Sequence, residues 1–432
     1  MSLPCISGCS KFKGQKIYAS DGGPGNIFSF AAVDIWGNYL ISGSLYNGPT
    51  GSAYIYERQE GGGWARVQKL TGPADANSFG QTVAISLGHA AASTHISDTF
   101  PKGAVFVYQR TSTGWTNMQT LQPDAADEGY GFGFAIDIDG GRMIVGKIAG
   151  SVYIYKWEYA APFAGVWTLE QKLTSPAQST VDQYGIGVSI SGNLAIVGAE
   201  GSALLSPHPG EAYIYEYDPV LTKWVFQQAI KPTDPHAGDS FGSSVAIRGF
   251  TERALVGAQG NNEAGDGAGA AYVFERQPGT WQQVAKLLPS TVQAHDGFSI
   301  TVTLADEFAV VGSWWDDTEG EDAGAVYPIR RSLVGEWFPI QRMTAWDAEP
   351  SDYFGHEVRT WWEYFVVASP RDDDKGHHAG AAYAYEPRPE EPSPGEGLVL
   401  DPWPYIYIYT GCGITVIDTP IQFPMHMKEG TN

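Results

Sequence analysis

A short pattern recurs seven times in this sequence. Each copy opens with an aromatic residue followed by Gly or Ser, at Phe28, Phe79, Tyr130, Tyr184, Phe241, Phe298 and Phe354. It continues with a strand-like run, a tight turn, a second run such as "IVGA", and a third such as "GEAYIYE". Six copies add a fourth run that opens with Trp. Units of four short strands cannot bury both sheet faces alone, so they are stable only when stacked.

The seventh copy lacks a fourth run, and a matching run stands at the other end of the chain. "GQKIYAS" (14–20) is similar to "VQKLTG" (67–72) and "EQKLTS" (170–175). The sequence therefore predicts an all-β fold, a seven-bladed β-propeller of four-stranded antiparallel blades whose last blade is closed by the N-terminal strand. We expect three segments: residues 1–26 with the closing strand, the propeller over 27–387, and a linker with a strand-like tail over 388–432.

Charge and hydropathy narrow the functional classes. A net charge of −22 argues against binding to nucleic acid, which requires a basic surface. No run approaches the roughly 18 apolar residues of a membrane helix, so we expect no membrane insertion. The start, "MSLPCISGCSKFKG", lacks the charged region and apolar core of a signal peptide. Cys5, Cys9 and Cys412 allow at most one internal disulfide, which would tie the chain ends together; free thiols are the alternative.

Two copies, "FGSSVAIRGFTERALVGA" and "YGIGVSISGNLAIVGA", resemble FG-GAP repeats, the unit of the integrin α-type propeller. The resemblance implies adhesion or ligand binding rather than catalysis, and an extracellular location or one on a cell or particle surface. Integrin-type repeats often carry a calcium loop of the form D-x-D-x-D-G-x-x-D. Here only "DIDGG", with Asp137 and Asp139, is similar, and it lacks the later acidic residues.

The loops between the second and third strands of copies 6 and 7 are long and acidic. Their carboxylates are candidate ligands for a hard cation such as Ca²⁺, although solvated loops are the alternative. The candidate ligands are Asp316, Asp317, Glu319, Asp372, Asp373 and Asp374. The adjacent His377 and His378 are candidates for ligand or transition-metal binding, although neighbouring surface histidines are commonly just exposed.

Paired tryptophans stand in two loops. Trp314 and Trp315 begin the acidic loop of copy 6, where they would stack on a sugar or anchor a protein partner, unless they pack between blades. Trp361 and Trp362 carry the same two interpretations and should lie on the opposite face of the propeller.

A side-chain oxygen stands two residues before each anchor aromatic. We expect it to accept backbone N–H groups and to fix the loop that enters the first strand, although a functional ring of carboxylates is the alternative. The positions are Asn26, Asn77, Glu128, Asp182, Asp239, Asp296 and Asp352.

The leading functional hypothesis is a non-enzymatic binding or adhesion propeller that recognises a glycan or protein through the acidic and aromatic loops of one face. One alternative is a hydrolase or lyase whose acid–base groups at the channel mouth include Asp234, His236, His295 and His356. Another alternative is a structural assembly module. No nucleophile elbow, phosphate loop or zinc-binding cysteine spacing is present, and the sequence leaves the oligomeric state open.

Overall fold

The computed structural model describes residues 12–74, 76, 78–94, 99–127, 129–148, 150–160, 164–177, 183–201, 208–387, 407–410 and 413–416. The chain divides into two units, Met1–Pro387 and Arg388–Asn432. All regular elements in these ranges are β-strands. Within the same ranges we find no helix with the length and hydrophobicity needed to cross a bilayer.

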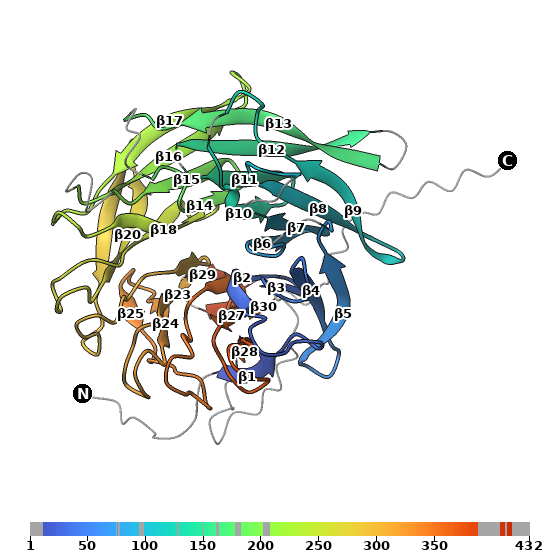
Figure 1. Ribbon diagram of the computed structural model, residues 1–432. Helices are drawn as coiled ribbons and strands as arrows, with labels where there is room; N and C mark the ends of the chain where they lie inside the picture. Colours follow the sequence, from blue (N-terminus) through green and yellow to red (C-terminus); the bar gives the residue numbers. More distant parts are fainter. Residues whose placement is uncertain are drawn as a thin grey trace. The chain divides into compact units, whose positions relative to one another are not determined.

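The first unit is a seven-bladed β-propeller, and Figure 1 shows its sheets arranged around a central axis. Blade 1 contains β2 (Phe28–Trp36), β3 (Tyr39–Ser44), β4 (Ser52–Arg58) and β5 (Trp64–Thr71). Blade 2 contains β6 (Val83–Ser86), β7 (His89–Thr94), β8 (Ala104–Thr111) and β9 (Gly114–Leu121). Blade 3 contains β10 (Phe132–Asp139), β11 (Arg142–Lys147), β12 (Ser151–Ala160) and β13 (Ala164–Thr174). Blade 4 contains β14 (Val188–Ser191), β15 (Leu194–Ala199), β16 (Glu211–Asp218) and β17 (Lys223–Ile230). Blade 5 contains β18 (Phe241–Arg248), β19 (Arg253–Ala258), β20 (Ala270–Gln277) and β21 (Thr280–Leu287). Blade 6 contains β22 (Val302–Leu304), β23 (Phe308–Ser313), β24 (Ala325–Arg331) and β25 (Trp337–Pro339). Blade 7 contains β26 (Val358–Trp361), β27 (Tyr364–Ser369), β28 (Ala381–Pro387) and β1 (Phe12–Ile17).

The N-terminal strand closes the ring. β1 is the outermost strand of blade 7 and pairs antiparallel with β28, from Phe12 opposite Pro387 to Ile17 opposite Ala382. This pairing confirms the predicted closure and the predicted fold class.

Glutamine side chains join the outermost strands of neighbouring blades. Gln15 Oε1 accepts the Trp64 backbone N–H at 2.6 Å, and Gln15 Nε2 donates to the Trp64 carbonyl at 3.0 Å. The same two bonds join Gln68 to Trp115, Gln119 to Trp167, Gln171 to Trp224 and Gln228 to Trp281. These amides satisfy backbone groups that the outer sheet edge leaves unpaired. β1 is therefore fixed to blade 7 by pairing and to blade 1 by Gln15.

The anchor aromatics are buried against aromatic residues of the third strand in every blade. The ring pairs have centroid distances between 5.1 and 5.8 Å, with the steep interplanar angles that aromatic quadrupoles favour. They are Phe28–Tyr54, Phe79–Phe106, Phe132–Tyr153, Tyr184–Tyr213, Phe241–Tyr272, Phe298–Tyr327 and Phe354–Tyr383.

The predicted anchor of copy 3 was wrong. Tyr130 is 58% exposed, and the buried anchor is Phe132, two residues later. The Phe132 backbone N–H donates to the Lys102 carbonyl at 3.0 Å, as the Phe79 N–H does to Thr50 in blade 2. The sequence "GYGFGF" offers two aromatic–Gly pairs, and the structure buries Phe132 and leaves Tyr130 exposed.

The Gly of the "VGA" run is required by a close contact between blades. A Cβ on Gly198 would stand 2.0 Å from the carbonyl oxygen of Gly242, in the aromatic–Gly pair of the next blade. Gly43 meets Gly80 in the same way, and Gly312 meets Gly355. The two halves of the repeat pattern therefore interlock across each junction.

The side-chain oxygens before the anchor aromatics of blades 5, 6 and 7 fix the loops that enter those blades. Asp239 accepts the His236 N–H at 2.8 Å, Asp296 that of Gln293 at 2.7 Å, and Asp352 that of Glu349 at 2.9 Å. These contacts confirm the predicted structural role at three positions. Asn77, Glu128 and Asp182 lie outside the described residues.

The second unit contains a two-stranded antiparallel hairpin of β29 (Tyr407–Thr410) and β30 (Gly413–Val416). Cys5, Cys9 and Cys412 lie outside the described residues.

Candidate functional site

The acidic loop of blade 6 is held partly by a basic side chain. Asp316 is buried and forms a two-point ion pair with the Arg342 guanidinium, with one contact at 2.9 Å. Asp317 accepts the backbone N–H of Asp322 at 2.8 Å, within the same loop, and Asp317 and Glu319 are exposed. Only these last two predicted ligands of blade 6 face solvent.

The acidic loop of blade 7 holds the closing strand. Lys16 Nζ of β1 contacts carboxylate oxygens of Asp372 at 2.5 Å, Asp374 at 2.7 Å and Asp347 at 2.8 Å. The Tyr18 hydroxyl donates to Asp374 at 2.5 Å. Although burial opposes it, the three carboxylates raise the pKa of Lys16 above its usual range. Asp372 and Asp374 therefore have a structural cation as their counter-ion.

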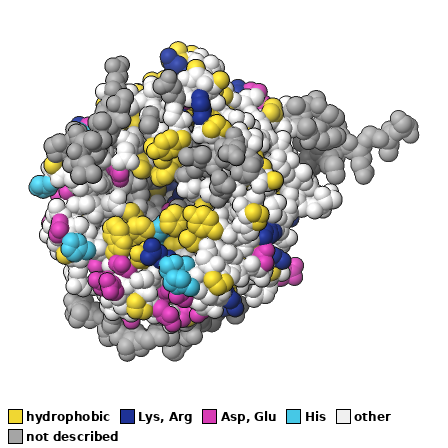
Figure 2. All heavy atoms as spheres, in the orientation of Figure 1, with side chains coloured by type: hydrophobic (Ala, Val, Ile, Leu, Met, Phe, Trp, Pro, Cys, Tyr) yellow, Lys and Arg dark blue, Asp and Glu magenta, His cyan; other side chains and the backbone are white. Residues whose placement is uncertain are grey.

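A group of aromatic side chains lies at the mouth of the central channel, beside these loops. Trp314 packs against Trp315 at 4.9 Å, Tyr353 at 5.4 Å and His356 at 4.1 Å between ring centroids, and His356 packs against Phe30 of blade 1 at 4.7 Å. We call these five side chains the aromatic platform. On the face of the molecule that Figure 2 shows, hydrophobic side chains border the central hollow, with histidine, basic and acidic side chains beside them.

The platform has one open edge. Trp314 is half-buried, whereas Trp315 is 37% exposed and covers Gly297, where a Cβ would meet its ring at 2.7 Å. The Arg371 guanidinium stacks on the Tyr353 ring at 4.3 Å and donates to the Tyr353 hydroxyl at 2.9 Å. Trp314 therefore packs against its neighbours and Trp315 is partly exposed, and the binding interpretation stays a prediction.

His356 is the buried polar group of the platform. Burial and the nearby Arg371 charge lower its pKa to about 3, so the imidazole is neutral at physiological pH. Neither of its ring nitrogens has a hydrogen-bond partner among the described residues, and the same holds for Trp314 Nε1. Buried donors and acceptors without partners cost free energy in the folded state, and the ring nitrogens of His89 in blade 2 are in the same situation.

The four candidate acid–base residues have separate neighbours. Asp234 forms an ion pair with Lys286 at 2.5 Å. His236 Nδ1 lies 3.8 Å from the Asp239 carboxylate, and His295 is exposed. The fourth, His356, packs within the platform.

The channel is lined by the innermost strand of each blade, whose free edge is satisfied by side chains of the preceding blade. Asp34 Oδ2 accepts the Ile85 N–H at 2.6 Å, and Asp137 Oδ2 accepts the Ile190 N–H at 2.8 Å. Ser189 and Thr303 accept the N–H groups of Ile247 and Thr360. Asp139 accepts the Gly192 N–H at 2.7 Å, so both acids of "DIDGG" join blades 3 and 4.

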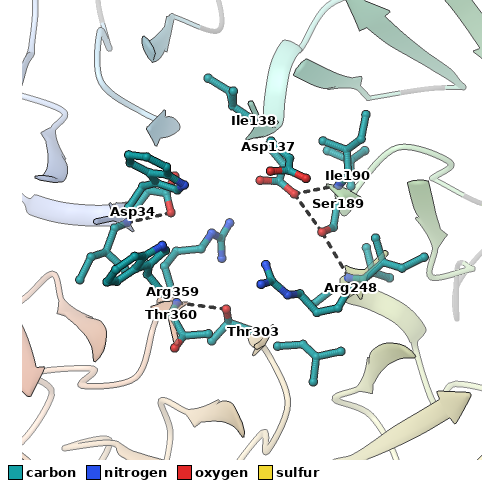
Figure 3. Close-up of a pocket in the computed structure, with 18 of the residues that line it drawn as sticks. Asp34, Asp137, Ile138, Ser189, Ile190, Arg248, Thr303, Arg359 and Thr360 are labelled. Carbon is teal, nitrogen blue, oxygen red and sulfur yellow. Dashed lines mark hydrogen bonds between the residues drawn. The ribbon is translucent and has the colours of Figure 1, made fainter. Parts of the chain in front are cut away.

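Charges of both signs meet inside the channel. Figure 3 shows Asp34 and Arg359 close together on one side of the channel, with Asp137 and Arg248 across from them. Burial raises the pKa of Asp34 to about 7, with Arg359 opposing the shift, and burial also raises the pKa of Asp137. Arg359 is itself paired with Glu357. The cavity has a volume of about 180 Å³, and its lining residues do not include those of the platform.

The second tryptophan pair lies in the turn between β26 and β27. Trp361 packs against Trp36 and Tyr364, at 6.4 and 6.1 Å between centroids, and Trp362 is 61% exposed. Trp362 is thus a second exposed aromatic, located in a turn separate from the platform.

Sequence reasoning missed three members of the mouth. Phe30, Tyr353 and Arg371 carry no motif, and they meet Trp314 only because blades 6, 7 and 1 are neighbours after ring closure. For Phe30 the sequence did offer a signal, because Phe30 and His356 each stand two residues after an anchor aromatic.

Comparison with known proteins supports the repeat assignment. The family model described as FG-GAP repeat matches residues 167–215, 224–274, 281–329 and 337–385. Among curated protein sequences, none matches this chain. The β-propeller domain of Cps50 (Swd1) from Myceliophteria thermophila is 10% identical with a TM-score of 0.51, covering 86% of this chain and 98% of that one. A Bacteroides uniformis protein described as a candidate 6-phosphogluconolactonase is 12% identical with a TM-score of 0.50, covering 76% and 88%. At these identities the likeness establishes the propeller fold alone.

Proposed function

We propose that this chain, a seven-bladed propeller of the FG-GAP repeat family, is a non-catalytic binding module. We propose further that it recognises a carbohydrate at the aromatic platform. The observation that carries the proposal is the partly exposed Trp315 ring beside polar groups at the channel mouth. Flat aromatic surface stacks on the apolar face of a sugar ring, and neighbouring polar groups bond its hydroxyls.

The size and charge of the mouth favour a sugar over a protein partner. Trp315 is the only one of the five platform residues with more than a third of its surface exposed, which is small for the buried centre of a protein interface. Arg371, Asp317 and Glu319 supply donors and acceptors of both signs around it. A carbohydrate-binding role agrees with the proposed location outside the cell or on a cell or particle surface.

Calcium is a separate part of the proposal. Asp317 and Glu319 are exposed and available to an ion, whereas Asp316, Asp372 and Asp374 would first have to release Arg342 and Lys16. A calcium arm in the binding experiment tests this point directly.

The experiment is a glycan array followed by calorimetry on the best ligand, with calcium or with a chelator. Trp315→Ala should weaken binding about tenfold or more, because a lost aromatic contact costs roughly 1.5 kcal/mol. Trp362→Ala removes an exposed Trp of the other turn and is the matched control, with binding unchanged. Equal affinity of the Trp315→Ala variant and the wild type would refute the site, and no binding to any glycan would refute the ligand class.

A further inference from the structure

The loop between β27 and β28 carries three metal-ligating side chains that do not belong to the platform. Asp373, His377 and His378 place one possible ligand atom each within 4.8 Å of one another, and they form the one such group found in the described residues. His377 Nδ1 lies 3.4 Å from Asp373 Oδ2, and the two imidazole rings stack with centroids 3.8 Å apart. Two ligand atoms that each lie about 2.0–2.1 Å from a tetrahedral ion are separated by roughly 3.3 Å, which is close to the first of these distances.

The backbone holds this loop in place. The His378 N–H donates to Asp373 Oδ1 at 2.5 Å, and the Gly376 N–H donates to the Asp373 carbonyl at 2.8 Å. The carbonyls of His377 and His378 accept N–H groups of Gly25 and Ile27 at 2.7 and 3.1 Å, on the segment entering blade 1. The three side chains therefore project from a fixed frame, which lowers the entropic cost of ordering them around an ion.

We propose that Asp373, His377 and His378 bind one divalent transition-metal ion such as Zn²⁺ or Ni²⁺, with solvent in the remaining coordination positions. Two imidazoles and one carboxylate suit such ions, whereas Ca²⁺ takes oxygen ligands only.

The position of the site gives the ion a structural consequence. The same loop holds Lys16 of the closing strand through Asp372 and Asp374, and its backbone holds residues 25 and 27. An ion that fixes the loop should therefore stabilise the junction between blade 7, β1 and blade 1. The inference is independent of the carbohydrate proposal.

The test is calorimetric titration of the full chain with Zn²⁺ and, separately, Ni²⁺, with metal content measured after dialysis. The wild type should bind one ion, and millimolar Ca²⁺ should not displace it. His377→Ala, His378→Ala and Asp373→Asn should each weaken binding roughly tenfold or more, since even outer-shell partners contribute that much. His236→Ala removes an exposed histidine of another loop and should bind as the wild type does.

Hydrogen exchange supplies the second measurement. The ion should slow exchange in β1 and around residues 25–27 of the wild type and leave the His377→Ala/His378→Ala double variant unchanged. The variants alter exposed or half-buried side chains, so their metal-free melting temperatures should match the wild type. Absence of saturable binding, or binding that survives in the double variant, would overturn the proposal.

Discussion

Replacing Lys16 by Met should weaken the ring closure more than replacing any other lysine of the repeat. The Lys16 side chain is 8% exposed, and its partner Asp372 is buried. Removing one member of a buried ion pair costs about 3–5 kcal/mol, because the other charge stays buried without its counter-ion. The Tyr383 hydroxyl still donates to Asp372 at 2.9 Å, and water reaches Asp347 and Asp374, so we expect the lower end of that range.

Lys69 supplies the matched control. It occupies the equivalent position in blade 1, is 28% exposed, and pairs with the half-exposed carboxylate of Asp21. A surface pair of this kind contributes about 0.2–1 kcal/mol. A domain of this size has an unfolding entropy of roughly 0.8 kcal/mol/K, so Lys16→Met should lower the melting temperature by about 4 °C and Lys69→Met by about 1 °C.

Calorimetry gives the two melting temperatures, and hydrogen exchange reports β1 directly if unfolding is irreversible. Exchange in β1 should accelerate in Lys16→Met and stay slow in Lys69→Met. If both variants melt within 1 °C of each other and β1 remains equally protected, the buried network around Lys16 is not what holds the closing strand.

Two further predictions concern pH and packing. Burial raises the pKa of Asp352 to about 7, above the roughly 3.9 of an unfolded Asp. The folded state then binds the extra proton, so stability should fall as pH rises from about 4 to 7, and Asp352→Asn should flatten this slope in melting curves. Gly198→Ala should destabilise the protein by about 1–3 kcal/mol in urea unfolding, because its Cβ would meet the Gly242 carbonyl. Gly61→Ala, with no atom within 4 Å of the new Cβ, should change stability by less than about 1 kcal/mol.

Most of the fold was predictable because every blade repeats the same packing contact. The Gly that follows an anchor such as Phe241 and the Gly of "VGA" recur at nearly constant spacing, because Gly198 meets the Gly242 carbonyl across the junction. The prediction failed at Tyr130 because two aromatic–Gly pairs stand two residues apart in "GYGFGF". Spacing cannot choose between them, and the choice of Phe132 depends on its three-dimensional contacts, including the bond to the Lys102 carbonyl.

The candidate site was predictable in composition but not in pairing. The acidic loops were visible in the sequence, yet the partner of Asp372 is Lys16, which stands more than 350 positions earlier. The sequence identified Trp314 and Trp315 but not their contacts with Phe30 and Tyr353, because these contacts arise only after the ring closes. Side-chain pairing between the first and last strands is a property of closure, which a repeat pattern does not encode.

Two residues of the aromatic platform depart from the repeat. Positions that follow the repeat are explained by packing between blades, such as the Gln15–Trp64 clamp and its copies. Trp314 stands where other copies have Leu45 or Glu200, and His356 leaves both ring nitrogens without a hydrogen-bond partner among the described residues. Both departures lie near the junction of blades 6, 7 and 1, and neither contributes to the repeated packing. We therefore expect the proposed ligand to contact the platform through the exposed part of Trp315.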